Sequence, residues 1–421
     1  MIDMSEIMNI QLSKNKNLFT TKINIIFLIL LPISIIIGSS IFNSLIILID
    51  LIFILELIKT RNNYILKDNN FYFLIIIFFY LICNSLFIAT DKDYPVKDYE
   101  SIKRSIGFLR FIILAYAIHF YFTKHRNKIL KYWLLIFMVV TVDIIFEYIF
   151  KVNMLGFSSV NGHRIASFMP DNLNIGGYYF GFIMLCLLYL KNSNQKFFII
   201  ASIFFFFTAL LIGERSNFIK ILFMYSFFIL FSYKINFYKK IILIFLIFSI
   251  TTGIILSNHE LKSKYVRWIV NPIVQTYNNH GLNYNAFVNR IEYFGLYNTA
   301  WKIFEKNLTF GSGLKTFRYE SYILRREDNS IYGASTHPHQ IHFELLSEIG
   351  LIGYLLIIFN LLNRINVNKF NNNHLSRSSI FFVVATLLPI LPSGSFFSSY
   401  SAVFFWINYA FLINAKPYSK P

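Results

Sequence analysis

Long apolar runs alternate with short polar segments along most of the chain. Many runs approach the length of about 20 residues that a helix needs to cross about 30 Å of hydrocarbon. The pattern therefore predicts an all-α, polytopic membrane protein of about twelve spanning helices. These helices are expected at roughly 23–40, 42–58, 70–89, 105–122, 132–150, 174–190, 197–213, 216–233, 238–256, 341–362, 378–393 and 398–415.

One long polar segment, 257–340, separates the ninth predicted span from the tenth. Tyr284 to Glu305 has the apolar spacing of an amphipathic helix, and Gly311 to Gly313 has the composition of a turn. We expect this segment to form a small helical cap over the membrane domain. The predicted organisation is a tail at 1–22, nine helices within 23–256, the cap at 257–340, three helices within 341–415 and a tail at 416–421.

Composition supports the membrane assignment. The 421 residues are 56% hydrophobic and 14% charged, and their mean hydropathy is +0.54. These values exclude an ordinary soluble domain. The two cysteines, Cys83 and Cys186, both lie within apolar runs, so we expect packing residues rather than a disulfide or a metal site.

The formal net charge of +18 predicts the orientation of the helices. Most Lys and Arg residues stand in every second polar segment, and the positive-inside rule places those segments in the cytoplasm. Both termini are then cytoplasmic, and the long 257–340 segment is periplasmic. Because the charges sit in short clusters between apolar segments, we expect contacts with membrane lipid and no nucleic-acid partner. The basic clusters are Lys14, Lys16 and Lys22; Lys59, Arg61 and Lys67; Lys124, Arg126 and Lys128; Lys191 and Lys196; Lys234, Lys239 and Lys240; Arg364, Lys369 and Arg377; and Lys416 and Lys420.

One short segment departs from this rule. Asp91 to Arg104 is predicted to be periplasmic, yet it holds Lys92, Lys97, Lys103 and Arg104. Acidic residues are mixed with these cations, and a Lys or Arg at a helix end can extend its charged group to the interface. The orientation stands because the other short segments agree with it.

Four cationic or titratable residues from distant parts of the chain fall on the periplasmic side, namely Arg164, Arg215, Arg290 and His339. Arg215 stands in the short connection Gly213 to Asn217, where a charge beside hydrocarbon is costly unless it is paired. It is either neutralised by Glu214 or by lipid phosphate, or it belongs to a functional site. An arginine fork suits a phosphate, since its planar donors match two oxygens at once.

Arg290 has a less specific setting. It lies early in an amphipathic stretch that ends near Asn307, and a solvated arginine paired with Glu292 is the simpler alternative. The Gly311-Ser312-Gly313 turn that follows lacks the strand context and the lysine of a phosphate-binding loop.

The start of the tenth predicted span holds three histidines and two acids, namely His337, His339, His342, Glu344 and Glu348. A histidine exchanges a proton near neutral pH, so an interfacial one is a candidate general base. A metal site is the alternative, but Pro338 interrupts the run and no His-Glu-x-x-His spacing occurs. We therefore expect no metal and no cofactor. The glutamates, one turn apart, could orient a histidine or cap the helix start.

The order His339-Gln340-x-x-Phe343-Glu344-x-x-x-Glu348-x-Gly350-x-x-Gly353 resembles the signature of the O-antigen ligase and O-antigen polymerase superfamily. The resemblance covers about the last two thirds of the chain. Other elements match in the same order: Arg164 to Asn172 with Phe168, Pro170 and Gly176; Arg215 in Glu-Arg-Ser; and Arg290 followed by Ala300-Trp301 and the Gly-Ser-Gly turn.

Two positions depart from the family pattern. Gln340 stands where the family has Asn, and Asp171 intervenes before Asn172. Two further histidines, His337 and His342, leave the identity of the base open on residue types alone. The position that matches the family's histidine is His339.

The resemblance implies a metal-independent, inverting glycosyltransferase in the bacterial inner (plasma) membrane, with its site facing the periplasm. Its implied donor is a glycan on undecaprenyl pyrophosphate. The implied acceptor is lipid A core in an O-antigen ligase, which the span count and the late position of the cap favour. In an O-antigen polymerase of surface polysaccharide the acceptor is a second lipid-linked glycan.

The resemblance also implies roles for the candidate residues. His339 would deprotonate the acceptor hydroxyl, while Arg215 and Arg290 would bind the pyrophosphate and stabilise its charge as it leaves. Arg164 would add a substrate contact. Three residues, Gln340, Glu344 and Glu348, would orient the histidine from behind.

A flippase or transporter of lipid-linked oligosaccharide is the alternative from another class. Such a protein should carry ionisable residues at mid-membrane depth, frequently in paired repeats. Here the mid-span positions are almost wholly apolar apart from Asp143 and Glu147, and no repeat is visible. A scaffold without chemistry would leave Arg215 unexplained. The pattern therefore favours a fixed site on one face of the membrane.

Overall fold

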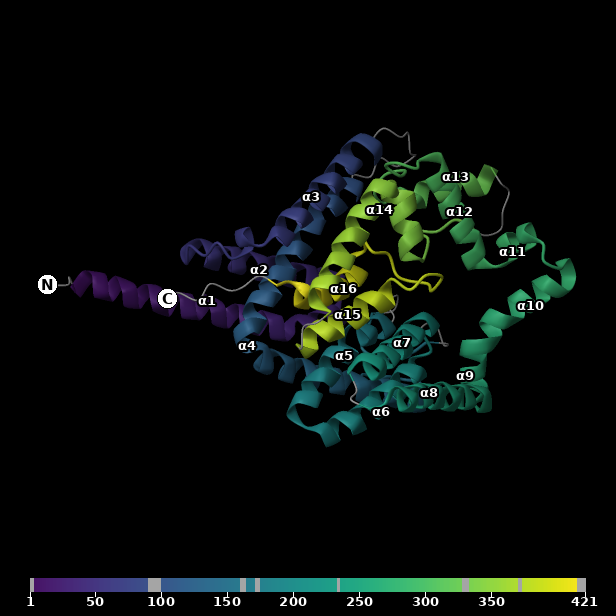
Figure 1. Ribbon diagram of the computed structural model, residues 1–421, viewed down its shortest axis with the longest axis horizontal. Helices are drawn as coiled ribbons and strands as arrows, with labels where there is room; N and C mark the ends of the chain where they lie inside the picture. Colours follow the sequence, from purple (N-terminus) through teal and green to yellow (C-terminus); the bar gives the residue numbers. More distant parts are fainter. Residues whose placement is uncertain are drawn as a thin grey trace.

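A computed structural model describes the chain over residues 4–89, 100–159, 164–170, 175–232, 235–327, 333–369 and 373–414. Every regular element within these ranges is a helix (Figure 1). Seven of the described helices are long and apolar enough to cross a membrane. The all-α, multi-pass prediction is confirmed at this level. Some of the sequence predictions concern residues outside these ranges. They are the predictions on Lys92, Lys97, Asp171, Asn172, Lys234, Lys416, Lys420 and the 416–421 tail.

The first two helices pair closely, and the third follows them after a short turn. α1 (Met4–Ile37) and α2 (Ser39–Lys59) form a hairpin that turns at Gly38, whose φ of 141° suits only glycine. A short 3-10 turn, η1 (Ile65–Lys67), leads to α3 (Asn69–Cys83), and a π-helical turn, η2 (Asn84–Ala89), continues α3.

α4 (Glu100–Phe150) is a single helix of 51 residues, where the sequence predicted two spans at 105–122 and 132–150. Its length of about 75 Å is more than twice the hydrocarbon thickness. The rings of Phe122 and Trp133 lie 5.1 Å apart, although a straight helix would separate these two positions by roughly 16 Å along its axis. The helix therefore bends between its two apolar halves instead of ending in a loop.

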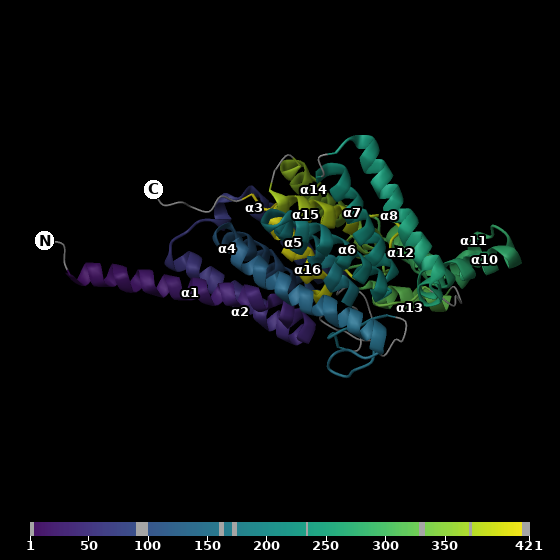
Figure 2. The same cartoon turned by 90° about the horizontal axis from the view of Figure 1, so that it is seen from below.

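The next four helices form the centre and one side of the bundle. They are α5 (Ile175–Ser193), α6 (Gln195–Ile212), α7 (Arg215–Ser232) and α8 (Phe237–Ser257). α5 and α7 are buried along much of their length, whereas only 6% of the apolar window of α8 is buried inside the protein. Figure 2 shows α8 at the edge of the bundle, where its side chains would face lipid.

The segment predicted as a cap contains α9 (His259–Lys262), η3 (Ser263–Arg267), α10 (Trp268–His280), α11 (Tyr284–Arg290), α12 (Glu292–Lys306) and α13 (Phe317–Glu327). The single helix predicted over Tyr284 to Glu305 is two helices, because Ile291 is extended, with φ −120° and ψ 114°. α12 and α13 share a small core with Leu296, Ile303 and Phe317. Both views show α10 and α11 projecting away from the bundle.

The chain ends with α14 (Ile341–Asn368), α15 (His374–Thr386), α16 (Ser399–Tyr409) and η4 (Ala410–Leu412). Spans were predicted at 378–393 and 398–415, but α15 and α16 have 13 and 11 residues, too few to cross the hydrocarbon. Their apolar side chains are buried inside the protein instead. The predicted count of twelve spans is therefore not confirmed by the described helices.

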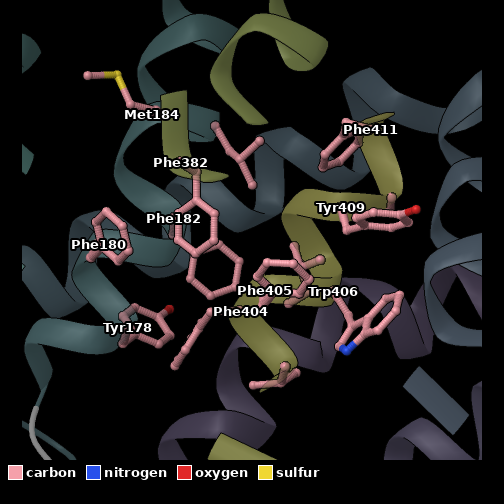
Figure 3. Close-up of a cluster of buried hydrophobic side chains, with 14 of the residues drawn as sticks. Tyr178, Phe180, Phe182, Met184, Phe382, Phe404, Phe405, Trp406, Tyr409 and Phe411 are labelled. Carbon is pink, nitrogen blue, oxygen red and sulfur yellow. The ribbon is translucent and has the colours of Figure 1, made fainter. Parts of the chain in front are cut away.

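The core between α5, α15 and α16 is aromatic (Figure 3). Phe180 stacks on Phe382 with ring centroids 4.5 Å apart, and Tyr178 and Phe182 each meet Phe404 edge-on. A Cβ on Gly181 would lie 2.7 Å from the Phe404 ring, so glycine permits this close approach. Cys186 is fully buried here, as expected for a packing residue.

Polar side chains also meet inside the bundle. Asn360 on α14 donates to Asn70 on α3 at 2.9 Å, and the Tyr409 hydroxyl donates to Asn360 at 2.6 Å. Each of these side chains is at most 3% exposed. Paired amides and hydroxyls satisfy one another there, which hydropathy cannot reveal. Asn70 and Asn360 stand at the ends of the predicted spans 70–89 and 341–362, so they do not test the prediction of almost wholly apolar mid-span positions.

Candidate active site

The site is built on a break in α14. Gly350 has φ 67° and ψ −174°, which interrupts the helix and frees the carbonyls of the preceding turn. The Gly-Ser-Gly turn fills this break: Ser312 N donates to Ser347 O and Gly313 N to Glu348 O, both at 2.9 Å. A Cβ on Gly311 would lie 2.5 Å from the backbone of residues 348–350. The glycines of both motifs are therefore needed for one backbone interlock.

α3 supports the same interlock from the other side. The Tyr80 hydroxyl donates to Ile349 O at 2.6 Å, and a Cβ on Gly353 would touch the Tyr80 ring at 2.7 Å. Asn84 donates to Phe310 O at 2.7 Å and accepts from Leu314 N at 2.8 Å. The turn before α13 is thus fixed relative to the start of α14, where the histidines stand.

His339 precedes α14 in a left-handed backbone conformation, with φ 57°. Its Nε2 lies 3.4 Å from Ser335 Oγ, and its ring meets Tyr293 of α12 edge-on at 6.2 Å. Its carbonyl accepts from Ser393 N at 2.7 Å. Burial lowers the pKa of His339, although the charges of Glu292 and Glu344 oppose that effect. The imidazole is therefore neutral, and able to accept a proton, at neutral pH.

His337 and His342 occupy different environments. The His337 ring lies 4.0 Å from the His339 ring, and burial followed by the charges of His339 and Lys315 lowers the pKa of His337 to about 3. His342 lies within 3.1 Å of the Tyr354 hydroxyl and 2.8 Å of Leu387 O, facing α15. These contacts give His342 a structural role, whereas the rings of His337 and His339 lie against each other as a pair.

Glu344 is buried and holds a lysine that the sequence analysis did not single out. Lys315 Nζ lies 3.5 Å from Glu344 Oε1, and both side chains are almost inaccessible. Ser395 donates to Glu344 Oε1, Phe396 N donates to Oε2 at 2.7 Å, and Lys315 also donates to Ser395. Glu344 therefore ties the turn before α13 to the segment before α16.

Gln340 and Glu348 have structural partners as well. The Gln340 side chain caps α14 by accepting from Phe343 N at 3.0 Å. Glu348 Oε2 accepts from Lys315 N at 2.9 Å, while its Oε1 is buried without a hydrogen bond among the described residues. Of the three predicted orienting residues, only Glu344 lies within electrostatic range of His339.

Arg215 begins α7, directly after the αL turn at Gly213. Glu214 does not neutralise it: one Glu214 oxygen accepts from Gly176 N at 3.1 Å and the other from Asn217 at 2.6 Å. Within the described part of the chain neither Arg215 nor Arg164 forms an ion pair. Burial raises the pKa of Glu214, so this acid is a weak counter-charge.

Arg164 is placed by the two acids in the second half of α4. Asp143 accepts from Met154 N at 2.7 Å and from the Ser167 hydroxyl, and Glu147 accepts from Ser167 N at 2.6 Å. Ile165 N donates to Ile212 O at 3.0 Å, which joins this loop to the end of α6. Asp143 and Glu147, predicted as isolated mid-span acids, therefore hold the Arg164 loop beside Arg215.

α12 links the arginines to the histidine. Arg215 and Arg164 both lie within electrostatic range of Tyr293, whose ring meets His339. Glu292 acts on Arg215 and on His339. Burial raises the pKa of Tyr293, so its hydroxyl stays protonated. The structure thus gathers Arg164, Arg215 and His339 around the start of α12.

Arg290 has a different setting. It ends α11, is exposed, and lines a depression between α10 and α11 with Pro272, Gln275 and Asn283. It forms no ion pair with Glu292 among the described residues. No interaction in the described part of the chain joins Arg290 to Arg215 or His339.

The residues described include no group of three His, Cys, Asp or Glu side chains that could hold a metal ion. Several basic residues that were not predicted as site residues lie near the histidine pair or in its supporting segments. They are Arg104, Arg110, Lys220, Lys315 and Arg318. Lys220 Nζ donates to Pro392 O. Lys315 and Arg318 follow the Gly-Ser-Gly turn directly, which was an available signal. Lys220 and Arg110 stood inside apolar runs, where a single cation is also a signal.

Fold and site define a multi-pass membrane protein with a cationic, histidine-containing site at one end of its bundle. Residues 180–358 match the family model described as O-Antigen ligase. The chain is therefore similar to that family over these residues, and the predicted resemblance to the O-antigen ligase and polymerase superfamily is confirmed there. The match includes Arg215, Arg290 and His339 and leaves Arg164 outside. No curated protein matches the chain.

Proposed function

We propose that the protein is an O-antigen ligase-type glycosyltransferase, which moves a glycan from undecaprenyl pyrophosphate to a sugar of lipid A core. The family match supports the ligase or polymerase class. The single observation that carries the mechanism is the gathering of Arg164, Arg215 and His339 around Tyr293. Two arginines without described ion-pair partners beside a neutral imidazole suit a diphosphate and a general base.

In the proposed reaction, an acceptor hydroxyl attacks the anomeric carbon of the donor glycan. The new bond forms between that oxygen and the carbon, and the bond from carbon to the diphosphate oxygen breaks with inversion. The acceptor proton goes to His339, and the diphosphate leaves with its negative charge stabilised by Arg215 and Arg164. This scheme needs no metal ion or cofactor, so a chelator should leave the rate unchanged.

Arg290 remains a proposed donor contact at the edge of this site. It precedes Ile291, and the chain then enters α12 with Glu292 and Tyr293. An arginine in that position suits the glycan or the outer phosphate more than the bond that breaks. Its replacement should therefore raise the KM for the donor more than it lowers kcat.

We further propose that the site faces the periplasm of the inner membrane, with both chain termini cytoplasmic. The alternating basic clusters support this orientation. The contacts of Ile165 with Ile212 and of His339 with Tyr293 support a common end of the bundle for Arg164, Arg215 and His339.

A flippase is the second candidate, because the bundle interior is more polar than the sequence suggested. Asp50 is 5% exposed with neither oxygen bonded to a described residue, and Lys220 is 3% exposed. A transport pathway would use such buried charges. Purified protein in liposomes that translocates a fluorescent lipid-linked glycan, without joining it to any acceptor, would favour this candidate.

The direct test uses purified protein in nanodiscs with a lipid-linked glycan donor and a core acceptor. We expect His339→Ala to lower kcat by roughly 10²–10⁴-fold and Arg215→Gln by roughly 10²–10³-fold. Arg126→Gln, an exposed arginine on α4 away from the site, is the matched control and should transfer normally. An unchanged rate of product formation by His339→Ala would remove the base from the proposal.

A further inference from the structure

A second group of arginines lies near the N-terminus of α16. Arg104 and Arg110 of α4 both donate to the Ser399 hydroxyl, at 3.1 and 2.9 Å. Arg318 of α13 lies 2.6 Å from Glu100, which also pairs with Arg104 at 3.4 Å. Three guanidinium groups from two distant segments therefore converge at the N-terminus of α16.

This group has hydrogen-bond donors that its acidic neighbours leave unused. Among the described residues, Glu100 is the carboxylate that forms ion pairs with the group, and it is shared by Arg104 and Arg318. Asp50 acts electrostatically on Arg110, and Arg318 acts on Glu348. Two donors, Arg110 Nε and Arg318 Nε, are buried without a hydrogen-bond partner among the described residues. Converging guanidinium groups with unused donors suit an anion such as a phosphate.

The group also lies beside the proposed reaction centre. Ser321 of α13 exchanges hydrogen bonds with the backbone of Ser335, at 3.3 and 3.4 Å, and Ser335 Oγ contacts His339. Arg318 acts electrostatically on His337, whereas Arg164 acts on His339. Each cationic group therefore acts on a different member of the histidine pair.

We propose that Arg104, Arg110 and Arg318 form a second anion site, which binds a phosphate or diphosphate carried by the acceptor. This inference rests on the proposed transfer, because Arg164 and Arg215 already serve the donor. It explains why Arg104 breaks the positive-inside pattern: its charge is needed at the site rather than for orientation. The shared chemistry is a phosphate ester, from a phosphorylated core glycan or from a second lipid-linked glycan.

Steady-state kinetics in nanodiscs test the proposal with three acceptors: phosphorylated core glycan, the same glycan after phosphatase treatment, and a lipid-linked glycan. We expect Arg104→Gln/Arg110→Gln to raise the KM for phosphate-bearing acceptors by roughly tenfold or more and to leave the donor KM within about twofold. The dephosphorylated acceptor should bind wild type and variant equally weakly. The phosphate-bearing acceptor whose KM rises in the variant is the source of the phosphate that this site binds.

Two results would overturn the second site: an unchanged acceptor KM in the double variant, or a loss that follows the anionic lipid content of the nanodisc rather than the acceptor phosphate. Arg104→Gln/Arg318→Gln repeats the test without disturbing Asp50, and Arg126→Gln is the control for loss of charge. If wild type transfers no glycan at all, the proposed function fails by itself.

A binding measurement distinguishes a failure of the second anion site from a failure of the proposed glycan transfer. In an Arg164→Gln/Arg215→Gln background, inorganic pyrophosphate should still bind the purified protein. Adding Arg104→Gln and Arg110→Gln should abolish that remaining binding. Pyrophosphate binding that survives all four substitutions would contradict the second site whether or not transfer is observed.

Discussion

Backbone strain marks the residues that carry the site. The described non-glycine residues with positive φ are Arg61, Lys151, Ser167, Lys315, His339 and Ile390. Ser167 holds the Arg164 loop, Lys315 pairs with Glu344, and His339 is the proposed base. A left-handed conformation costs free energy in residues other than glycine, so its persistence at these positions supports a functional role.

The pH dependence of transfer should follow His339. A base acts in its neutral form, and burial lowers the pKa of His339 below its ordinary value of about 6.5. The rate should therefore rise with pH to a plateau and reach half of its plateau value below pH 6.5. A profile of kcat against pH, corrected for stability, checks this. A midpoint above pH 7 would rule out a buried neutral base.

Lys315 should be a determinant of stability. Lys315→Met leaves the Glu344 carboxylate buried without its counter-charge, and breaking such a pair typically costs about 3–5 kcal/mol. We expect a marked drop in the thermal midpoint of the detergent-solubilised protein. The double variant Lys315→Met/Glu344→Gln should recover part of the loss, because the uncompensated charge is gone. A single variant as stable as wild type would show that the buried pair does not contribute.

Sequence reasoning at the residue scale named the histidine and the arginines but not the partners of the supporting residues. The Gln340 side chain caps α14. Glu344 lies within electrostatic range of His339, while it bonds Ser395, Phe396 and Lys315. Motif spacing reports which residues occur together along the chain, whereas these partners come from segments 29 and 51 residues away.

At the scale of elements, the glycine motif has a mechanical explanation. A broken membrane helix must satisfy its freed backbone groups within the protein. The Gly-Ser-Gly turn does so for α14, and Leu351 N and Ile352 N return hydrogen bonds to Leu308 O and Thr309 O. The two motifs, about 40 residues apart, are therefore two halves of one structure that fixes α12 and α13 beside α14.

Gly350→Ala should disrupt this interlock. Its φ and ψ lie in a region that only glycine occupies readily, and a Cβ there would clash with Thr309 O and Gly311 N. We expect a loss of roughly 3 kcal/mol or more, read as lower yield and a lower thermal midpoint. Gly253→Ala, in the lipid-facing α8 with open space around it, is the matched control and should be neutral or stabilising. Equal stability of the two variants would argue against the interlock.

Helix boundaries were predicted to within a few residues where one helix coincides with one apolar run. α2, α5 and α7 lie close to their predicted ranges of 42–58, 174–190 and 216–233, although α5 and α7 are buried in the protein. α15 and α16 were misjudged because residues such as Phe382 and Trp406 are equally apolar but pack within the protein. Hydropathy does not distinguish burial in lipid from burial in protein.

At the scale of the whole molecule, the proposed orientation predicts opposite labelling of two exposed positions. In a Cys83→Ala background, Asn278→Cys on α10 should react with a membrane-impermeant maleimide in cells with a permeable outer layer. Gln195→Cys, between α5 and α6, should react only after the inner membrane is opened. Both side chains are exposed, so access to reagent decides the outcome. The reverse labelling pattern would place the site on the cytoplasmic side and contradict the proposed periplasmic orientation.

The sequence by itself determined that the protein lies in a bilayer, and it indicated the class of protein. Apolar runs of spanning length require helices in a bilayer, and the order of short motifs indicated the resemblance to the superfamily. Only the tertiary structure decided which polar groups meet: Arg164 with Arg215, the histidine pair with α12, and Arg104 with Arg318. The reason is physical, since hydrophobic periodicity sets which face of a helix is apolar, whereas the position of one buried charge relative to another depends on how all the helices pack.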